Sequence, residues 1–427
     1  MQTVAADALV DFQGLNIHIH YDDTNKEGFF NAYGDFDKKL VPVLARLGVR
    51  HLRDGLPAYK GASRDSFFYK RVRDLVARGY RFNMLATLPF DVHPATDVSM
   101  LKTYQEWCGG GIEAFEGANE PQDHQLADAR RLQEALYKAV QAQGLKVPVL
   151  SPSIISNNRG LGDVGQWVDF GAIHTYYGKG MPSGSLASDI KSKSVCWPEK
   201  PIMMTECGPH NAVNNWKRQE GHDPIDEEGA RQYAVRMILE YFASERVKRI
   251  YSYEALDQHP NPELDRKEDN FGLARYDGTL KGAGEEVAWF NALVAEPGQV
   301  GYKPQDYDVK VEGDDARFLF ARKRSGERFL FLWRNVPVGT KNADLKVTLP
   351  EAIGGYTLHR RDTKEKIWVS FGSEASRTVH DVSYTFDPAT GGQSGFKAVP
   401  RLVTSKVNGK SSSFTVPIGA AVCAVQF

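Results

Sequence analysis

The chain has 427 residues, 41% of them hydrophobic and 25% charged, with a formal net charge of −1. This composition is ordinary for a protein with a large hydrophobic core. The near-zero charge gives no support to a nucleic-acid partner or a membrane-surface partner. No segment reaches the roughly 18 apolar residues that a membrane span needs.

Short apolar segments of β type alternate with longer helical segments as far as about residue 295. The predicted strands are 15–20, 49–55, 81–89, 112–121, 147–154, 170–178, 201–208 and 249–257. Helices are predicted at 36–48, 67–79, 127–144, 186–195 and 228–246, where apolar residues recur at helical spacing. Repeated βα units of this kind predict an α/β fold, a closed parallel (β/α)8 TIM barrel rather than an open sheet.

The pattern changes after about residue 298. From there to the end of the chain, short segments alternate apolar and polar residues between turn residues such as Gly, Asn, Asp and Pro. This pattern is typical of an antiparallel β-sandwich. The Gly- and Pro-rich segment 296–304 separates the two patterns, so we expect a catalytic barrel over 1–297 and a C-terminal β-sandwich domain over 298–427.

Two glutamates stand at the ends of predicted strands, where reactive residues of such barrels lie. Glu120 closes the fourth predicted strand in the segment GANEP, and Glu206 closes the seventh in MMTECG. Retaining hydrolysis of a glycosidic bond uses two carboxyl groups about 5 to 5.5 Å apart, one as acid/base and one as nucleophile. A single Glu at a strand end is as often a surface salt-bridge partner or a helix cap, but two in these strands favour catalysis.

The proximity of two carboxyl groups predicts how they share protons. Two like charges close together resist being ionised at once, so one carboxyl group raises the pKa of the other. We therefore expect Glu120 to be held protonated while Glu206 is ionised. Once Glu206 is esterified its charge is gone, and Glu120 can then ionise and act as a base.

The segment FEGANEP, followed by Glu206 on the seventh predicted strand, resembles clan A of the glycoside hydrolases. It is similar to the acid/base motif of family 39 and related families. The resemblance covers the whole barrel by the order of its motifs, and a β-sandwich behind the barrel is common in that clan. It implies a retaining enzyme that cleaves β-glycosidic bonds of a poly- or oligosaccharide, with Glu120 as acid/base, Glu206 as nucleophile and no cofactor or metal.

The resemblance also implies roles in substrate binding. Asn119 would hydrogen-bond the sugar 2-hydroxyl, an interaction that strengthens in the transition state. Arg53, at the end of the second predicted strand, would orient Glu206 and keep it ionised. The alternative for Arg53 is a plain ion pair with Asp54 or Glu116.

Further candidates stand on the sixth and eighth predicted strands. His174 and Tyr176 alternate on the sixth, so both side chains should face one side. Tyr176 would then bond the nucleophile and His174 the acid/base or the sugar, unless either is a barrel-core residue. The clan usually places a Trp on the eighth strand, whereas this chain offers Tyr253 as a stacking platform and Glu254 as a partner for a hydroxyl.

The segment 207–226 after Glu206 is long enough to shape sugar subsites, and Trp216 and His210 in it are candidates for sugar contacts. Cys207, beside Glu206, should point away from it on a strand, which favours a buried thiol over a nucleophile.

A metal-dependent hydrolase is the main alternative function. His18 and His20 form the HxH spacing by which amidohydrolase barrels hold a metal, and His174 and Asp257 could complete that set. The fifth predicted strand supplies no His, however, and in clan A barrels these histidines can bind sugar. A non-catalytic sugar-binding barrel and an inverting hydrolase are two further alternatives.

The sequence leaves the cellular compartment open. Its first residues, MQTVAADALVDFQG, lack the basic and apolar regions of a signal peptide. The protein is therefore either cytoplasmic, or its sequence starts after a signal peptide that has been removed. Our expectation is a secreted or periplasmic location. The cysteines show no CxxC spacing, so a cysteine zinc site is not expected, and they could form two disulfides or four thiols. They are Cys108, Cys196, Cys207 and Cys423.

Overall fold

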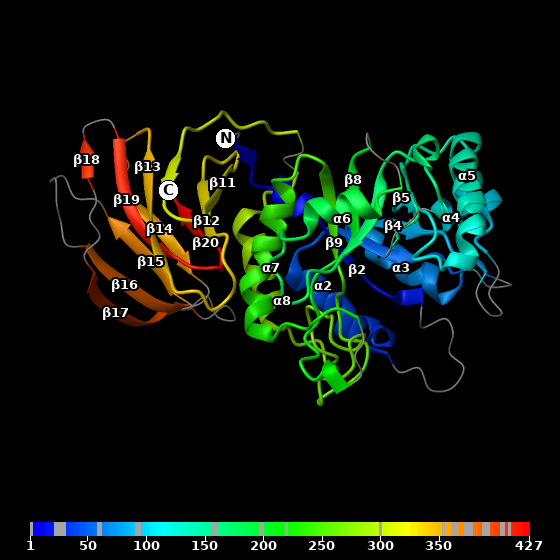
Figure 1. Cartoon of the computed structure of the whole chain (residues 1–427), viewed down its shortest axis with the longest axis horizontal. Helices are drawn as coiled ribbons and strands as arrows, with labels where there is room; N and C mark the ends of the chain where they lie inside the picture. Colours follow the sequence, from blue (N-terminus) through cyan, green and yellow to red (C-terminus); the bar gives the residue numbers. More distant parts are fainter. Residues whose placement is uncertain are drawn as a thin grey trace. The chain divides into compact units, whose positions relative to one another are not determined.

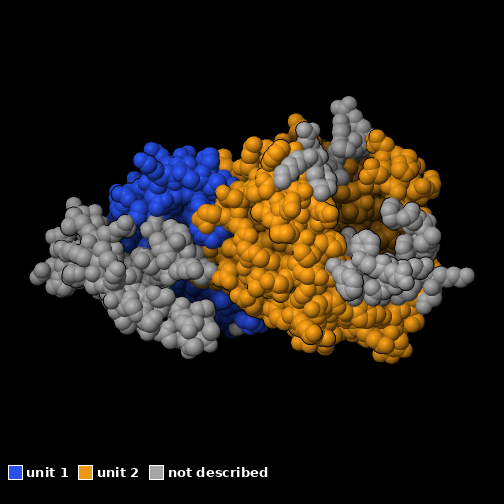
Figure 2. All heavy atoms as spheres, turned by 90° about the horizontal axis from the view of Figure 1, so that it is seen from below, with its two compact units in different colours: residues 1–9, 231–239, 292–427 blue, residues 10–230, 240–291 orange. Residues whose placement is uncertain are grey.

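Figure 1 shows the computed structural model of the chain. It describes residues 3–20, 31–57, 62–89, 95–154, 160–195, 200–217, 221–298, 301–351, 353, 355–360, 365–370, 379–386, 393–401, 406–408 and 411–427. The chain divides into two compact units, coloured separately in Figure 2. The barrel unit comprises Val10–Ala230 and Glu240–Asn291, and the sandwich unit comprises Met1–Leu9, Arg231–Leu239 and Ala292–Phe427.

The barrel unit is built on one eight-stranded sheet in the order β6-β5-β4-β3-β2-β9-β8-β7, in which neighbouring strands are parallel. Its strands are β2 (Gln13–Asn16), β3 (His51–Gly55), β4 (Arg81–Leu85), β5 (Ile112–Glu116), β6 (Val149–Leu150), β7 (Gly171–Thr175), β8 (Ile202–Cys207) and β9 (Val247–Ser252). A parallel bridge between Leu150 and Phe170 joins the β6 edge to the β7 edge. The sheet is therefore closed, which confirms the predicted (β/α)8 barrel.

Helices connect the strands and surround the sheet (Figure 1). They are α1 (Ala8–Asp11), α2 (Val41–Leu47), α3 (Phe67–Ala77), α4 (Leu101–Trp107), α5 (Leu126–Ala142), α6 (Leu186–Lys193), α7 (Glu227–Phe242) and α8 (Gly282–Val294). Because helices cover the sheet outside and side chains fill it inside, β8 is buried at all six positions. The helix α2 ends at Gly48, whose φ of 68° gives the left-handed cap that glycine adopts most easily.

Each predicted barrel strand has a counterpart in the structure, but all except the strand predicted at 49–55 end earlier than predicted. The strand predicted at 15–20 is β2, which ends at Asn16, because the Asp54 carboxylate accepts the N–H of Ile19 (2.9 Å) and draws the chain out of the ladder. The strand predicted at 112–121 is β5, which ends at Glu116. The residues beyond these ends lie in loops and can face the barrel mouth.

The sandwich unit contains two further sheets, of order β1-β11-β12-β20-β14-β15-β16-β17 and β10-β13-β19-β18. Its strands are β1 (Val4–Ala5), β10 (Lys310–Glu312), β11 (Ala316–Arg322), β12 (Arg328–Arg334), β13 (Ala343–Leu349), β14 (Gly355–Arg360), β15 (Glu365–Ser370), β16 (Val379–Phe386), β17 (Gln393–Arg401), β18 (Lys406–Asn408), β19 (Ser411–Ile418) and β20 (Cys423–Gln426). In β19 the burial alternates residue by residue, and its buried members join one apolar core with Leu330, Leu345 and Tyr356. This unit is the predicted β-sandwich.

The division of the chain into two units does not follow a single boundary at residue 297. The two-residue strand β1 near the N-terminus pairs in parallel with β11 of the sandwich. The middle of α7 also belongs to the sandwich unit, where Arg236 Nη1 donates to the Val336 carbonyl oxygen at 2.7 Å. Three chain segments therefore build the sandwich unit. Among the described helices, none combines the length and the apolarity that a membrane crossing requires.

Candidate active site

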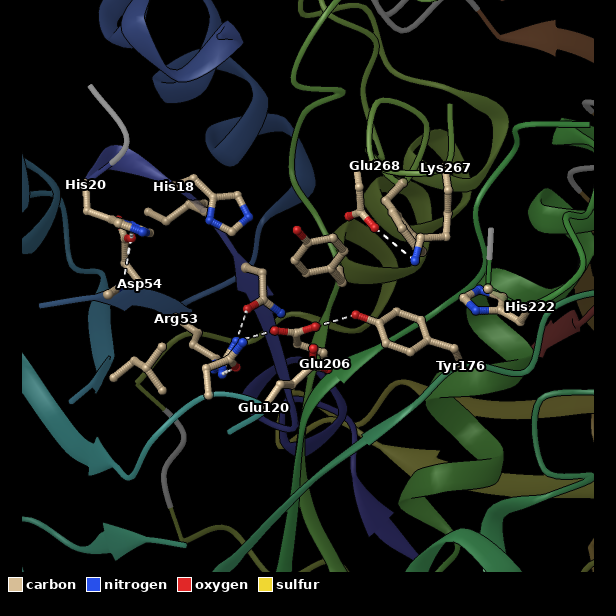
Figure 3. A pocket seen from close by; sticks show the side chains of 18 of the residues that line it. His18, His20, Arg53, Asp54, Glu120, Tyr176, Glu206, His222, Lys267 and Glu268 are labelled. Carbon is tan, nitrogen blue, oxygen red and sulfur yellow. Dashed lines mark hydrogen bonds and ion pairs between the residues drawn. The ribbon is translucent and has the colours of Figure 1, made fainter. Parts of the chain in front are cut away.

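A cavity of about 530 Å³ opens at the carboxyl ends of the barrel strands. Its lining includes most of the polar residues that the sequence indicated (Figure 3). The lining residues are Asn16, Ile17, His18, His20, Arg53, Asp54, Gly55, Leu85, Asn119, Glu120, Tyr176, Lys193, Glu206, Gly221, His222, Tyr253, Lys267, Glu268 and Phe271. This mixture of carboxylates, cations and rings can hold a polar ligand with some apolar faces.

Glu206 lies near the end of β8 and is largely buried. Its Oε1 accepts a hydrogen bond from Arg53 Nη1 at 2.8 Å, and its Oε2 accepts one from the Tyr176 hydroxyl (Figure 3). His174 Nδ1 lies 3.4 Å from the same Oε2. Both oxygens are thus held by donors, which fixes the orientation of the carboxylate.

Glu120 lies four residues beyond the end of β5, in a loop held against the segment after β6. Its N–H donates to the Ser153 carbonyl oxygen at 3.0 Å. Its φ of +42° is in the left-handed region, which residues other than glycine rarely adopt. The side chain accepts a hydrogen bond from His174 Nδ1 at 2.6 Å.

The structure brings the two glutamates together. Glu120, His174 and Glu206 each offer one ligand-type atom, and these atoms lie within 4.8 Å of one another. One oxygen of each glutamate is therefore closer than 4.8 Å to the other, which matches the short carboxyl separation of retaining glycosidases rather than the roughly 6.5 to 9.5 Å of inverting ones.

The charge state of Glu120 differs from the sequence-based expectation. Burial raises the pKa of Glu120, but the hydrogen bond and charge of His174, together with Arg53 and Lys267, outweigh burial and lower the pKa overall. The expectation that the neighbouring carboxylate keeps Glu120 protonated is therefore wrong for the free site. The sequence did not show that three cationic or hydrogen-bonding side chains surround this carboxyl group.

Arg53 connects several polar side chains of the site through its hydrogen bonds. Besides Glu206, it donates from Nε and Nη2 to the two oxygens of Glu116, at 2.8 and 2.9 Å. It also donates to the side-chain oxygens of Asn16 (2.9 Å) and Asn119 (2.7 Å). Burial lowers the pKa of Arg53, but the two carboxylates outweigh it and raise the pKa, so the guanidinium stays charged. Arg53 thus contacts both Glu206 and Glu116, the partners that the two alternative predictions for it named.

Asn119 is exposed and lines the cavity. Its side-chain oxygen accepts hydrogen bonds from Arg53 and, at 3.2 Å, from the Ser153 hydroxyl. These two bonds fix the orientation of the amide, because both of its oxygen's hydrogen bonds are made within the protein. The remaining N–H groups of the amide are donors suited to a hydroxyl of the ligand.

His18 and His20 lie beyond the end of β2, although the predicted strand 15–20 included both of them. Both line the cavity on the side away from Tyr176 and His222 (Figure 3). His20 Nδ1 bonds the buried Asp54 carboxylate, which fixes the ring at the edge of the cavity. Burial lowers the pKa of His18 to about 3, and this ring is therefore neutral at ordinary pH.

The metal alternative finds only part of its predicted ligand set in one place. His18, His20 and Asp54 offer ligand atoms within 4.8 Å of one another. The other two predicted ligands are elsewhere: His174 bonds Glu120, and Asp257 pairs with Lys281 at 2.7 Å. Asp54 also bonds two backbone N–H groups, which already explains its burial.

Three other candidates are not at the cavity surface. Glu254 is fully buried and accepts hydrogen bonds from Tyr33 (2.9 Å) and Gln258 (3.1 Å), and its burial raises its pKa well above the usual range. The prediction that Glu254 binds a substrate hydroxyl is therefore wrong. Trp216 is 69% exposed and lies outside the cavity lining, and His210 is buried with a ring nitrogen 2.9 Å from the His222 carbonyl oxygen.

Tyr253, the predicted stacking residue, does line the cavity. The sequence analysis did not identify several other lining residues, among them Lys193, His222, Lys267 and Phe271. These side chains come from the end of α6 and from the loops after β8 and β9. The only signal for them was the length of those loops, because a loop sequence does not say which of its side chains turn inward.

The described cysteines, Cys108, Cys207 and Cys423, are buried free thiols, and Cys196 lies outside the described residues. Cys207 Sγ donates to the Tyr251 carbonyl oxygen at 3.5 Å, and burial raises the pKa of this thiol. A protonated thiol is a poor nucleophile. Cys207 therefore has a structural position, as its place on the strand predicted.

Fold and cavity together define a (β/α)8 barrel with a β-sandwich unit and a carboxylate pair at the barrel mouth. No protein-family model matches the chain, and no curated protein matches it. Among solved structures, the chain is similar to a family 39 glycoside hydrolase from Bacteroides cellulosilyticus WH2. The TM-score is 0.59 at 12% identity, covering 99% of this chain and 82% of the other.

Two more solved structures match over the whole chain. The family 39 enzyme from Xanthomonas axonopodis pv. citri has a TM-score of 0.55 at 13% identity, covering 100% of this chain and 95% of that one. A family 51 alpha-L-arabinofuranosidase from Bifidobacterium longum has a TM-score of 0.51 at 12% identity, covering 100% and 97%. The expected likeness in fold to clan A glycoside hydrolases is therefore confirmed.

Proposed function

We propose that the protein is a retaining glycoside hydrolase in which Glu206 is the nucleophile and Glu120 the acid/base. The observation that carries this proposal is the approach of the two carboxyl groups to within 4.8 Å at the mouth of a closed barrel. The similar solved structures support it, because they are glycoside hydrolases with the same fold.

Each residue has a distinct part in the proposed reaction. Glu206 attacks the anomeric carbon while Glu120 donates a proton to the leaving oxygen, which forms a glycosyl ester on Glu206. Glu120 then takes a proton from water, the water attacks the ester, and the sugar leaves with its original configuration. Arg53 and Tyr176 hold Glu206 in place for the attack, and Asn119 binds the hydroxyl next to the anomeric carbon.

The lowered pKa of Glu120 in the free site sets a condition on the first step. Glu120 must be protonated when the bond breaks. A bound sugar excludes water from the cavity and so increases the burial of Glu120, the factor that raises its pKa. Substrate binding therefore favours the acid form, whereas the free site favours the base.

The substrate class within carbohydrates is also a proposal. Polar side chains surround the cavity, and Tyr253 and Phe271 provide rings on which the apolar face of a sugar can pack. We propose a β-linked poly- or oligosaccharide and a secreted or periplasmic location. An α-L-arabinofuranoside belongs in the substrate panel, because one similar structure carries that activity in its name.

The test compares the wild type with Glu120→Gln and Glu206→Gln on a panel of aryl glycosides and polysaccharides. We expect each substitution to lower kcat by at least about 1,000-fold, since each removes a group that acts in the reaction. Glu134→Gln, on the exposed face of α5, is the matched control and should keep full activity. NMR of the first-formed product should show retained anomeric configuration, and azide should restore turnover of Glu120→Gln on a substrate with a good leaving group.

Other outcomes would point to the alternatives. Full activity in both Gln variants together with loss of activity in a chelator would favour a metal enzyme at His18 and His20. Inverted product would exclude the covalent intermediate. Tight binding of a polysaccharide without turnover of any substrate by the wild type would indicate a sugar-binding barrel.

A further inference from the structure

Glu116 is a buried carboxylate beneath the cavity that no step of the proposed reaction uses. It is the last residue of β5, it is fully buried, and it does not line the cavity. Both of its oxygens accept hydrogen bonds from Arg53, and Oε2 accepts another from Asn83 Nδ2 at 2.6 Å. A carboxylate buried this deeply is retained only where its charge is fully paired.

The bonds of Arg53 explain what Glu116 does for the cavity. A guanidinium has five N–H groups. Arg53 makes five hydrogen bonds, two of them to Glu116, one to Glu206 and one each to Asn16 and Asn119. The bidentate contact with Glu116 fixes the plane of the guanidinium, so that its remaining N–H groups point at the nucleophile and at Asn119.

Glu116 also partly neutralises the positive charge of Arg53. One guanidinium lies between two carboxylates, so Glu206 experiences only part of its positive charge. A fully paired Glu206 would be held in its ionised form so firmly that it would be a weaker nucleophile. The second carboxylate limits this effect, and it also reduces the positive field that Arg53 exerts on Glu120.

We infer that Glu116 is a positioning residue, which orients Arg53 and sets the electrostatic potential at both reacting glutamates. The inference rests on the proposed glycosidase function and deepens it. Glu116 touches neither substrate nor reacting atoms and acts only through Arg53. Its removal should therefore change how the activity depends on pH, which simple loosening of the fold would not do.

Glu116→Gln removes the negative charge and keeps the size. The cavity becomes more positive, so a carboxyl group that faces it loses its proton at lower pH, and Glu120 is one such group. We expect both limbs of the kcat/KM profile to move to lower pH by about one unit, the order of magnitude for one charge at an effective dielectric of about 20. With an activated aryl substrate, kcat should fall about 10- to 100-fold while KM changes less.

Glu113→Gln is the matched control. Glu113 is on the same strand and also pairs with an arginine, but this arginine is Arg249 (3.1 Å) and not Arg53, and its other partner is His51. Its neutralisation should leave both limbs in place. Glu116→Asp, which restores the charge on a shorter side chain, should return the limbs to the wild-type pH with part of the lost kcat.

Two results would overturn the inference. Glu116→Gln could fold and keep the wild-type pH profile and kcat, or Glu113→Gln could shift the limbs equally. If Glu116→Gln does not fold, Asn83→Ala takes its place. It removes one of the two hydrogen bonds to Glu116 Oε2 without changing any charge, and an unchanged kcat in that variant would refute the positioning role. A wild type that cleaves no glycoside would instead refute the proposed function, before any comparison of variants.

Discussion

His174 connects the two reacting glutamates, since its Nδ1 lies 2.6 Å from Glu120 and 3.4 Å from Glu206. In the free site its hydrogen bond opposes the burial of Glu120 and helps to lower that pKa. Because the pKa is depressed in the folded state, ionised Glu120 stabilises the fold above the pKa of the unfolded chain. This contribution is lost as the pH falls through the folded-state pKa.

His174→Ala should therefore raise the pKa of Glu120, because burial is then opposed less. We expect the basic limb of the pH–activity profile to move to higher pH by about one unit, with a lower kcat. The stability that ionised Glu120 contributes near neutral pH should shrink at the same time. The measurements are kcat/KM across pH and urea denaturation at pH 4 and pH 7. A basic limb that moved to lower pH would contradict this account of Glu120.

For single residues, the sequence could predict the position of a side chain where that position follows from the end of a strand. Arg53, His174 and Glu206 all lie on barrel strands near their carboxyl ends, so the strand pattern alone predicts that they meet at the barrel mouth. Glu254 and Trp216 could not be placed in this way. Their directions depend on loop contacts with residues far away in the sequence, such as the hydrogen bond between Tyr33 and Glu254.

Among the elements, β2 and β9 pack too closely for a side chain at Gly14. Gly14 pairs with Tyr251, and a Cβ atom at Gly14 would lie 2.3 Å from the Tyr251 ring. The ring is fully buried and cannot move aside at low cost. Gly14→Ala should therefore destabilise the protein by about 1–3 kcal/mol, the usual range for overpacking a core. Urea denaturation measures the effect, and an unchanged midpoint would show that β2 and β9 can separate freely.

The existence of the elements was easier to predict than their ends. The eight barrel strands follow from apolar periodicity, which is local in the sequence. The end of β2 follows from a bond between Ile19 and Asp54, 35 residues apart, and no local pattern contains it. The helices α4 and α8 were not predicted.

For the whole molecule, the two units predict how the chain tolerates truncation. A fragment of residues 1–297 would keep β1 and the middle of α7 but lose the sandwich strands with which they form one unit. Arg236 is fully buried in the full chain and would lose its partners Asn335 and Val336. We expect this fragment to aggregate or to melt at least about 10 °C below the full chain, since buried polar and apolar groups become exposed. A fragment as stable as the full chain would show that the barrel does not depend on the sandwich.

The fold class was predictable from the number and order of βα repeats and from the change of pattern near residue 298. The membership of β1 in the sandwich was not. A strand of two residues has no alternation to detect, and its partner β11 is more than 300 residues away in the chain. Long-range pairing of short segments is thus the part of this architecture that sequence patterns miss.

The backbone conformation of Glu120 lowers the stability of the fold, whereas the proposed reaction requires the side chain of this residue. A φ of +42° at a residue with a side chain costs of order 1–3 kcal/mol, which glycine at the same position would largely avoid. Laboratory evolution for thermostability alone would therefore favour glycine here and discard turnover with it. On the proposed mechanism, only selection for activity keeps glutamate at position 120, and a glycine at this point of the loop would mark a stabilised but inactive relative.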